Sequence, residues 1–190
     1  EQMLSTFKHW VANQPAGYFV EAKLAERDQR HARFGGTRYA VEPNVKDGKG
    51  GLRDLHTLFW ISKYAYRLDH VRGVLGAGIL RTSEARAFAS SQRFLWTVRC
   101  FLHQHHGRED DRLTFDAQMQ LAPLMGFADR SGLRGVERFM KRYYLAARQV
   151  GNLTRIFCAA LATDFDQRPR LSLRKLWVAG VAQRLNIKPF

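Results

Sequence analysis

Residues 46–54, KDGKGGLRD, place two lysines among three glycines directly before an apolar run. Glycines let backbone N–H groups approach a ligand closely, and the N-terminus of a following helix adds partial positive charge. Lys46 and Lys49 would then reinforce the binding of a phosphate or an acidic loop. The Walker pattern needs Ser or Thr after Gly-Lys, whereas Gly50 follows here. A structural turn is therefore the favoured interpretation on spacing alone.

Two clusters have side chains that bind metals in other proteins. His103, His105 and His106 precede three acidic residues, but only the first and third share a helix face, and no second ligand pair has a recognisable spacing. The DFD sequence at 164–166 has the two-carboxylate spacing that holds Mg²⁺ in nucleotidyl transfer, yet no Gly-Ser occurs in the chain. We therefore expect no metal site here.

No local signature of a catalytic centre is visible. His is never followed by Asp, so the His-Asp metal phosphohydrolase motif is absent, and Ser-His-Asp or Cys-His arrangements have no supporting elbow. We expect no catalytic residues in this chain.

The stretch DDRLTFDAQ at 110–118 is also informative. Asp116 can begin a helix whose apolar residues Met119, Leu121 and Leu124 face inward. Arg112 is well placed to pair with a carboxylate, and Asp54 in the first turn of its own helix favours the helix dipole. Structural roles are the simpler interpretation of all three.

Composition and periodicity predict a mainly α fold, a helical bundle with a small β element near residues 38–45. Tyr39, Val41 and Val45 favour extended backbone, and Pro43 pushes its predecessor the same way. A short strand pair is a further expectation for LWVAGVAQRLNI near the C-terminus. Helices are expected over about 18–34, from 52 onward, over 82–106 and over 132–161.

The last of these helices has two faces. One is an apolar stripe of Val136, Met140, Tyr143, Ala147, Val150 and Phe157. Arg134, Lys141, Arg148 and Arg155 recur every seven residues on the other side, which favours a solvated face over a phosphate-tracking one.

The net charge is +14, from 31 Lys plus Arg against 17 Asp plus Glu. Nucleotides, nucleic acid or an acidic protein surface are therefore plausible partners. Cys100 and Cys158 lie in apolar helical runs and are expected to be reduced and buried, which fits a cytoplasmic location. No apolar run approaches the ~20 residues needed to span a bilayer. Because the sequence begins at Glu1 without Met, we expect a piece of a longer protein.

Three stretches together resemble a known family. YAVEPNVKDGKGGLRDLHTLFWI, FLHQHHGREDDRLTFDAQMQLA and ERFMKRYYLAARQVGNLTRIF occur in this order and are similar to the bacterial PII uridylyltransferase, or uridylyl-removing, family. The resemblance covers about residues 18–162. A looser form of the first stretch occurs in the glutamine-synthetase adenylyltransferase, but DDRLTFDAQ favours the uridylyltransferase.

The resemblance implies an enzyme that attaches UMP from UTP to a tyrosine of the nitrogen-signalling protein PII, using Mg²⁺. It also implies a separate His-Asp domain that removes the UMP, and ACT domains that sense glutamine. The transferase carboxylates would lie before this chain and the other domains after it, so the chain alone is expected to be inactive.

The resemblance also suggests site residues and domain limits. The residues that match its signature are Glu42, Asn44, Lys46, Gly50, Gly51, Arg53 and Asp54. They would either close the nucleotide- or partner-binding side of the transferase or brace its junction with the bundle. The expected domains are the end of the transferase region at 1–51, a helical domain at 52–162 and a linker or short β segment at 163–190.

Two alternatives remain open at this point. One is a basic helical module that binds nucleic acid, whose affinity would fall steeply with salt, and which we consider the weaker interpretation. The other is a structural linker domain, as in a related adenylyltransferase.

Overall fold

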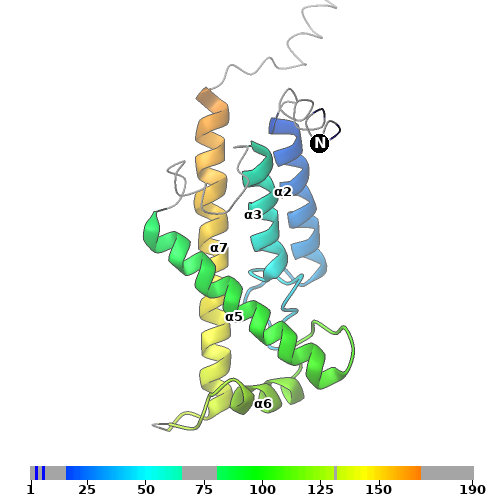
Figure 1. Cartoon of the computed structure of the whole chain (residues 1–190), viewed down its shortest axis with the longest axis vertical. Coiled ribbons are helices and arrows are strands. Elements are labelled where there is room, and N and C mark those ends of the chain that lie inside the picture. The colour runs from blue at the N-terminus through cyan, green and yellow to red at the C-terminus, as the bar shows by residue number, and fades with distance from the viewer. Residues whose placement is uncertain (1–2, 4–5, 7–15, 66–80, 131, 168–190) are drawn as a thin grey trace, which may run out of the picture. The chain divides into compact units, whose positions relative to one another are not determined.

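A computed structural model of the chain describes residues 3, 6, 16–65, 81–130 and 132–167. The chain divides into two compact units, Glu1–Phe157 and Cys158–Phe190, and the side-chain contacts of the fold and of the site lie within the first. The helices are α2 (Ala16–Arg33), α3 (Leu52–Ala65), α5 (Thr82–His106), α6 (Phe115–Leu124) and α7 (Gly135–Gln167). The predicted mainly helical fold is confirmed (Figure 1).

Helices α2 and α3 run side by side (Figure 1). Leu52, Leu55 and Ile61 of α3 are each at most 1% exposed and form the apolar face of that helix. The rings of Phe19 and Tyr64 stack with centroids 4.1 Å apart and connect the beginning of α2 to the end of α3. Burial of these side chains holds α3 between α2 and the rest of the unit.

Helix α5 crosses the bundle obliquely and packs on α7 (Figure 1). Ser91 donates a 2.8 Å hydrogen bond to Gln149, and the rings of Phe94 and Phe139 lie 6.3 Å apart. The predicted apolar stripe of α7 is confirmed except at Val136, which is only partly buried. On α5 the buried residues are Phe88, Leu95, Val98 and Leu102, and on α7 they include Met140, Tyr143, Ala147, Val150 and Phe157. Arg134, Lys141, Arg148 and Arg155 are all exposed.

The predicted β element near 38–45 is wrong for the described chain. Only an isolated bridge forms there, between Asn44 and Arg112. Pairing stops after that one residue because the Asn44 side chain accepts the N–H groups of Lys46 and Asp47 and turns the backbone away. The strand pair expected near the C-terminus falls outside the described residues.

Three further predictions were wrong in whole or in part. In α6, Leu121 is buried, but Met119 and Leu124 are 64% and 61% exposed, because this ten-residue helix buries only a narrow face. The side chain that caps α6 is Thr114, which accepts from the N–H of Ala117 at 3.3 Å, rather than Asp116. Cys100 is exposed and Cys158 is only partly buried, so the prediction that both are buried is wrong. No helix in the described part of the chain is long and apolar enough to cross a bilayer.

Candidate functional site

The signature loop, residues 42–54, uses its own backbone donors. Asn44 Oδ1 accepts from Lys46 N and Asp47 N at 3.1 and 2.6 Å, and Asn44 O accepts from Gly48 N at 3.0 Å. Gly51 N donates to Gly48 O at 2.9 Å. The loop therefore folds on itself as an Asx turn followed by a second tight turn.

The N-terminus of α3 is closed in the same way. Leu52 N donates to Val45 O at 3.0 Å, and Arg53 N donates to Lys46 O at 2.8 Å. Taken together, the N–H groups of residues 45–48 and 50–54 all donate within the chain. A phosphate cradle needs such groups to point at the ligand, so this loop does not form one.

Two glycines of the loop are required by close packing. Gly50 has a φ of 84°, and a Cβ there would lie 2.5 Å from the carbonyl oxygen of Ala147 on α7. A Cβ at Gly51 would lie 2.7 Å from the carbonyl oxygen of Val45. Any side chain at either position would push the loop off α7 or break its turn.

Asp54 is the polar centre behind this loop. Its carboxylate is 2% exposed and accepts from Arg30 Nη2 at 2.5 Å, His31 Nε2 at 2.8 Å and Gly50 N at 2.8 Å. Burial raises the pKa of Asp54, but the His31 hydrogen bond and charge, the Gly50 N–H and the Arg30 charge together hold that pKa below its usual value. One buried carboxylate thus joins the end of α2, the loop and α3.

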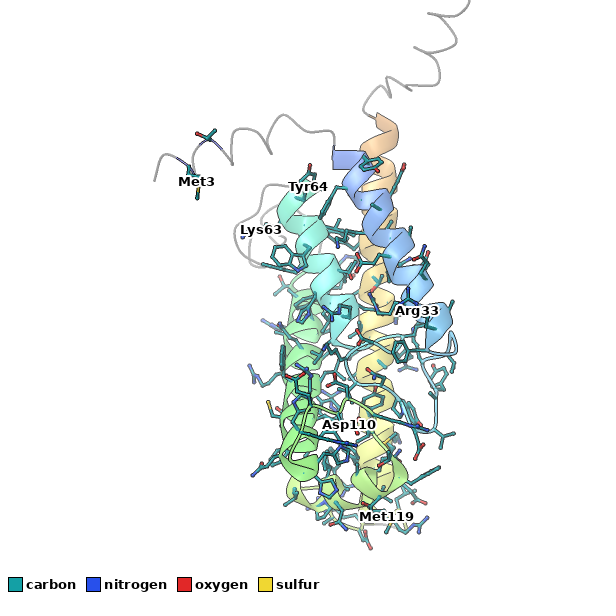
Figure 2. The ribbon with its side chains drawn as sticks, turned by 90° about the vertical axis from the view of Figure 1, so that its right-hand side faces the viewer. Met3, Arg33, Lys63, Tyr64, Asp110 and Met119 are labelled. Carbon is teal, nitrogen blue, oxygen red and sulfur yellow. The ribbon has the colours of Figure 1, made fainter. Side chains whose placement is uncertain are left out.

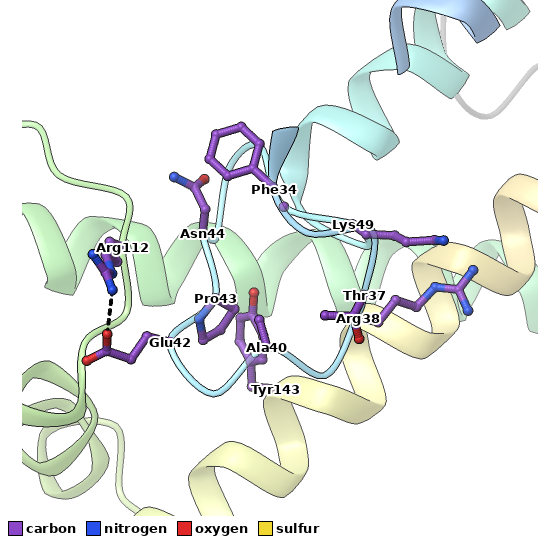
Figure 3. A pocket seen from close by; sticks show the side chains of 11 residues that line it. Phe34, Thr37, Arg38, Ala40, Glu42, Pro43, Asn44, Lys49, Arg112 and Tyr143 are labelled. Atoms are coloured by element: carbon purple, nitrogen blue, oxygen red, sulfur yellow. Dashed lines mark hydrogen bonds and ion pairs between the residues drawn. The ribbon is translucent and has the colours of Figure 1, made fainter. Parts of the chain in front are cut away.

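Glu42 joins the loop to the second informative stretch. Its carboxylate accepts from Arg112 Nη2 at 2.7 Å and from the N–H of Phe115 at 3.0 Å, so the predicted pairing of Arg112 with a carboxylate is confirmed (Figure 3). The Phe115 N–H, with the Arg112 side chain after it, lowers the pKa of Glu42. Gln118 adds hydrogen bonds to the carbonyls of Val41 and Leu113. The two stretches form one hydrogen-bonded unit although they lie about 70 residues apart in sequence.

A cavity of about 280 Å³ opens beside this unit. Figure 3 shows Arg38 and Lys49 extending in one direction while Glu42 reaches the opposite way to Arg112. Lys49 Nζ donates to the Gly36 carbonyl at 2.9 Å, so this lysine is already engaged by the loop. The cavity is lined by Phe34, Thr37, Arg38, Ala40, Glu42, Pro43, Asn44, Gly48, Lys49, Arg112 and Tyr143.

Lys46 faces a second shared carboxylate. Asp111 lies 3.7 Å from Lys46 Nζ and accepts from Arg99 Nε at 2.6 Å and from His103 Nε2 at 3.0 Å. Burial raises the pKa of Asp111, but the hydrogen bonds from Arg99 and His103 and the nearby charges lower it overall. Arg99 was missed by sequence reasoning, although its spacing of four from His103 on one helix face was a usable signal.

Arg53, the other outward cation of the loop, pairs with Asp47 at 3.2 Å and has a side chain that is 43% exposed. The signature therefore divides in two. Glu42, Asn44, Gly50, Gly51 and Asp54 are hydrogen-bonded to or closely packed on other parts of this chain. Lys46 and Arg53 each pair with one carboxylate and keep 30% and 43% of their side chains exposed. Whether either group serves nucleotide or partner binding stays a prediction.

The described residues do not fit a resident Mg²⁺ ion. No group of three or more His, Cys, Asp or Glu side chains among them is placed to hold a metal. Each histidine of the 103–106 cluster instead faces one carboxylate: His103 faces Asp111, His105 faces Asp116 and His106 faces Asp110.

Comparison with known proteins gives a consistent result. The family model described as GlnD PII-uridylyltransferase matches residues 18–158. The chain is 53% identical over 172 residues to the bifunctional uridylyltransferase/uridylyl-removing enzyme of Azospirillum brasilense, covering 90% of this chain and 18% of that protein. The enzyme of the same name from Rhodospirillum rubrum is 56% identical over 158 residues, 83% of this chain and 17% of the relative. No solved structure matches.

Proposed function

This chain belongs to the PII-uridylyltransferase family, and from that premise we propose that the polypeptide containing it transfers UMP from UTP to a tyrosine of PII. The chain spans about a fifth of the length of the curated relatives that it matches, so the activity belongs to the longer protein. The observation that carries the proposal is the match over residues 18–158, which includes the whole signature loop.

The same proposal covers the other properties of the longer enzyme. Transfer uses Mg²⁺ held by carboxylates outside this chain, removal of UMP takes place at a His-Asp domain, and glutamine acts as an effector at ACT domains. A cytoplasmic location accompanies this assignment. The support is the family membership and the name of the relatives, which includes both uridylyl transfer and uridylyl removal.

For this chain we propose a division of roles within the signature loop. Glu42, Asn44, Gly50, Gly51 and Asp54 brace the helical domain, because each is bound to other parts of the same chain. Lys46 and Arg53 are the residues available for recognition, because their side chains are 30% and 43% exposed. The domain limits at about residues 51 and 162 belong to the same proposal.

The activity is tested with the complete polypeptide. Purified full-length protein, UTP, Mg²⁺ and PII should yield PII that carries one uridylyl group, detected by intact-mass spectrometry and located on a tyrosine by peptide mapping. The isolated 190-residue chain should show no transfer. Failure of the full-length protein to modify PII under these conditions would overturn the proposed activity.

A further inference from the structure

One surface, away from the buried Asp54 carboxylate, combines cationic side chains with large exposed aromatic rings. On α3, His56 and Trp60 lie four residues apart and therefore on one helix face. On α5, the Trp96 ring lies 6.0 Å from the His56 ring, and the Arg99 guanidinium lies over Trp96 at 5.4 Å. These contacts place the two helices' side chains on a single surface.

The two outward cations of the loop belong to the same surface. Lys46 and Arg99 share Asp111, and Arg53 begins the turn of α3 that precedes His56. We name this surface the cation–aromatic face. Its members are Lys46, Arg53, His56, Trp60, Trp96 and Arg99. In Figure 2, α3 and α5 lie along one side of the view and α2 along the other.

The tryptophans of this face are exposed. Trp60 is 53% exposed and Trp96 is 37% exposed, although most large apolar side chains of α3 and α5 are buried. Trp and Arg are the residue types that most often dominate protein–protein binding energy. Exposed rings flanked by cations are thus the composition of a binding hot spot rather than of an ordinary solvated helix.

The charge of the face is positive. Three permanent cations, those of Lys46, Arg53 and Arg99, face two carboxylates, those of Asp47 and Asp111. The pKa of His56 is lowered, first by burial and then by the charges of Arg53, Arg99 and Lys46, and the second cause is consistent with a positive face. A complementary partner must therefore bring carboxylates of its own.

We infer that the cation–aromatic face is the docking surface for the acceptor protein PII, presented through an acidic patch. This inference rests on the proposed function, from which the identity of the partner comes. Asp47 and Asp111 hold Arg53 and Arg99 in fixed positions, which lowers the entropy lost when a partner carboxylate binds.

The test uses steady-state kinetics of the complete enzyme with the organism's own PII and UTP. Trp60→Gln should raise KM for PII roughly tenfold, as expected when a hot-spot side chain is lost, and leave KM for UTP within about twofold. Tyr18→Gln is the matched control, because Tyr18 is an 83% exposed ring on α2, outside the face. The control should leave both KM values unchanged.

Charge is tested separately. Arg53→Gln should raise KM for PII and reduce its dependence on salt, whereas Arg53→Lys should retain most of the affinity. Arg155→Gln, which removes an exposed cation from α7, should have no effect. If the Trp60→Gln variant does not fold, the comparison of Arg53→Gln with Arg53→Lys still tests whether this face docks PII.

Several outcomes would overturn the inference. A rise in KM for UTP instead of PII would make the face a nucleotide surface, and unchanged kinetics in both Trp60→Gln and Arg53→Gln would leave it without a role in docking. Failure of the wild-type enzyme to transfer UMP would refute the proposed activity instead, so the two failures are distinguishable.

Discussion

Asp54 and Asp111 are two carboxylates that each contact several basic side chains, but in two different environments. The Asp54 carboxylate contacts the side chains of Arg30 and His31. The Asp111 carboxylate contacts those of Lys46, Arg99 and His103. Asp54 is 2% exposed at the centre of the α2–loop–α3 junction, whereas Asp111 is 13% exposed beside cations that reach solvent. Burial makes the first cluster a structural support, and exposure leaves the second able to present cations.

The largest expected effect comes from breaking the buried cluster. Asp54→Asn leaves the Arg30 charge without its carboxylate, which should lower the free energy of unfolding by roughly 3–5 kcal/mol. Urea denaturation of the 190-residue chain, followed by circular dichroism, measures the change. A loss below about 1 kcal/mol would show that this cluster is not the structural support that its burial implies.

Gly50→Ala tests the packing of the loop on α7. The new methyl group would meet the Ala147 carbonyl, and the positive φ is strained for alanine, so we expect a loss of about 2–4 kcal/mol in the same experiment. Gly107→Ala is the control, since Gly107 also has a positive φ of 62° but has open space around it. Its cost should be only roughly 1–2 kcal/mol. Equal losses would mean that contact with α7 adds nothing.

Asp111→Asn should cost less than Asp54→Asn. The bases around Asp111 keep access to water, so the lost attraction is partly replaced by solvation, and we expect about 1–2 kcal/mol. The comparison of the two variants by urea denaturation tests the central contrast between the clusters. A larger loss for Asp111→Asn than for Asp54→Asn would reverse it.

The smallest expected effect is on the pH dependence of the free energy of unfolding. His56 has a pKa lowered in the folded chain, by burial first and then by Arg53, Arg99 and Lys46, so its unfolded form binds protons more readily. The associated stability is complete above the unfolded value of about 6.5 and is lost as pH falls from there through the folded pKa. His56→Gln should therefore flatten the decline in unfolding free energy between about pH 7 and 5, by less than roughly 1 kcal/mol. An unchanged slope would contradict the assignment.

The sequence predicted what depends on local periodicity. The 82–106 helix and the buried stripe of α7 follow directly from apolar spacing, and both are observed. The strand near residue 40 failed because β-branched residues favour extended backbone, whereas the side chain of Asn44 imposed a turn through its hydrogen bonds. Local propensity does not include such a competing partner.

The site was harder to predict because its partners are distant in sequence. Asp54 was expected to favour its own helix dipole, but Arg30 and His31 approach it from another helix, 24 and 23 residues earlier. Arg112 was expected to find a carboxylate, yet nothing in the spacing identified Glu42, 70 residues away. Only the packing of α2 on α3, and of the loop on the segment that precedes α6, determines these pairs.

The division of the signature loop is tested most directly by one measurement in the full-length enzyme. Lys46→Ala, assayed for transfer of UMP to PII, for removal of UMP and for melting temperature, separates recognition from support. We predict that transfer falls, removal persists and stability changes by no more than about 0.5 kcal/mol, because Lys46 is a partly exposed cation 3.7 Å from its carboxylate. Equal loss of both activities with a lowered melting temperature would show that Lys46, like Asp54, supports the fold, and would contradict the division.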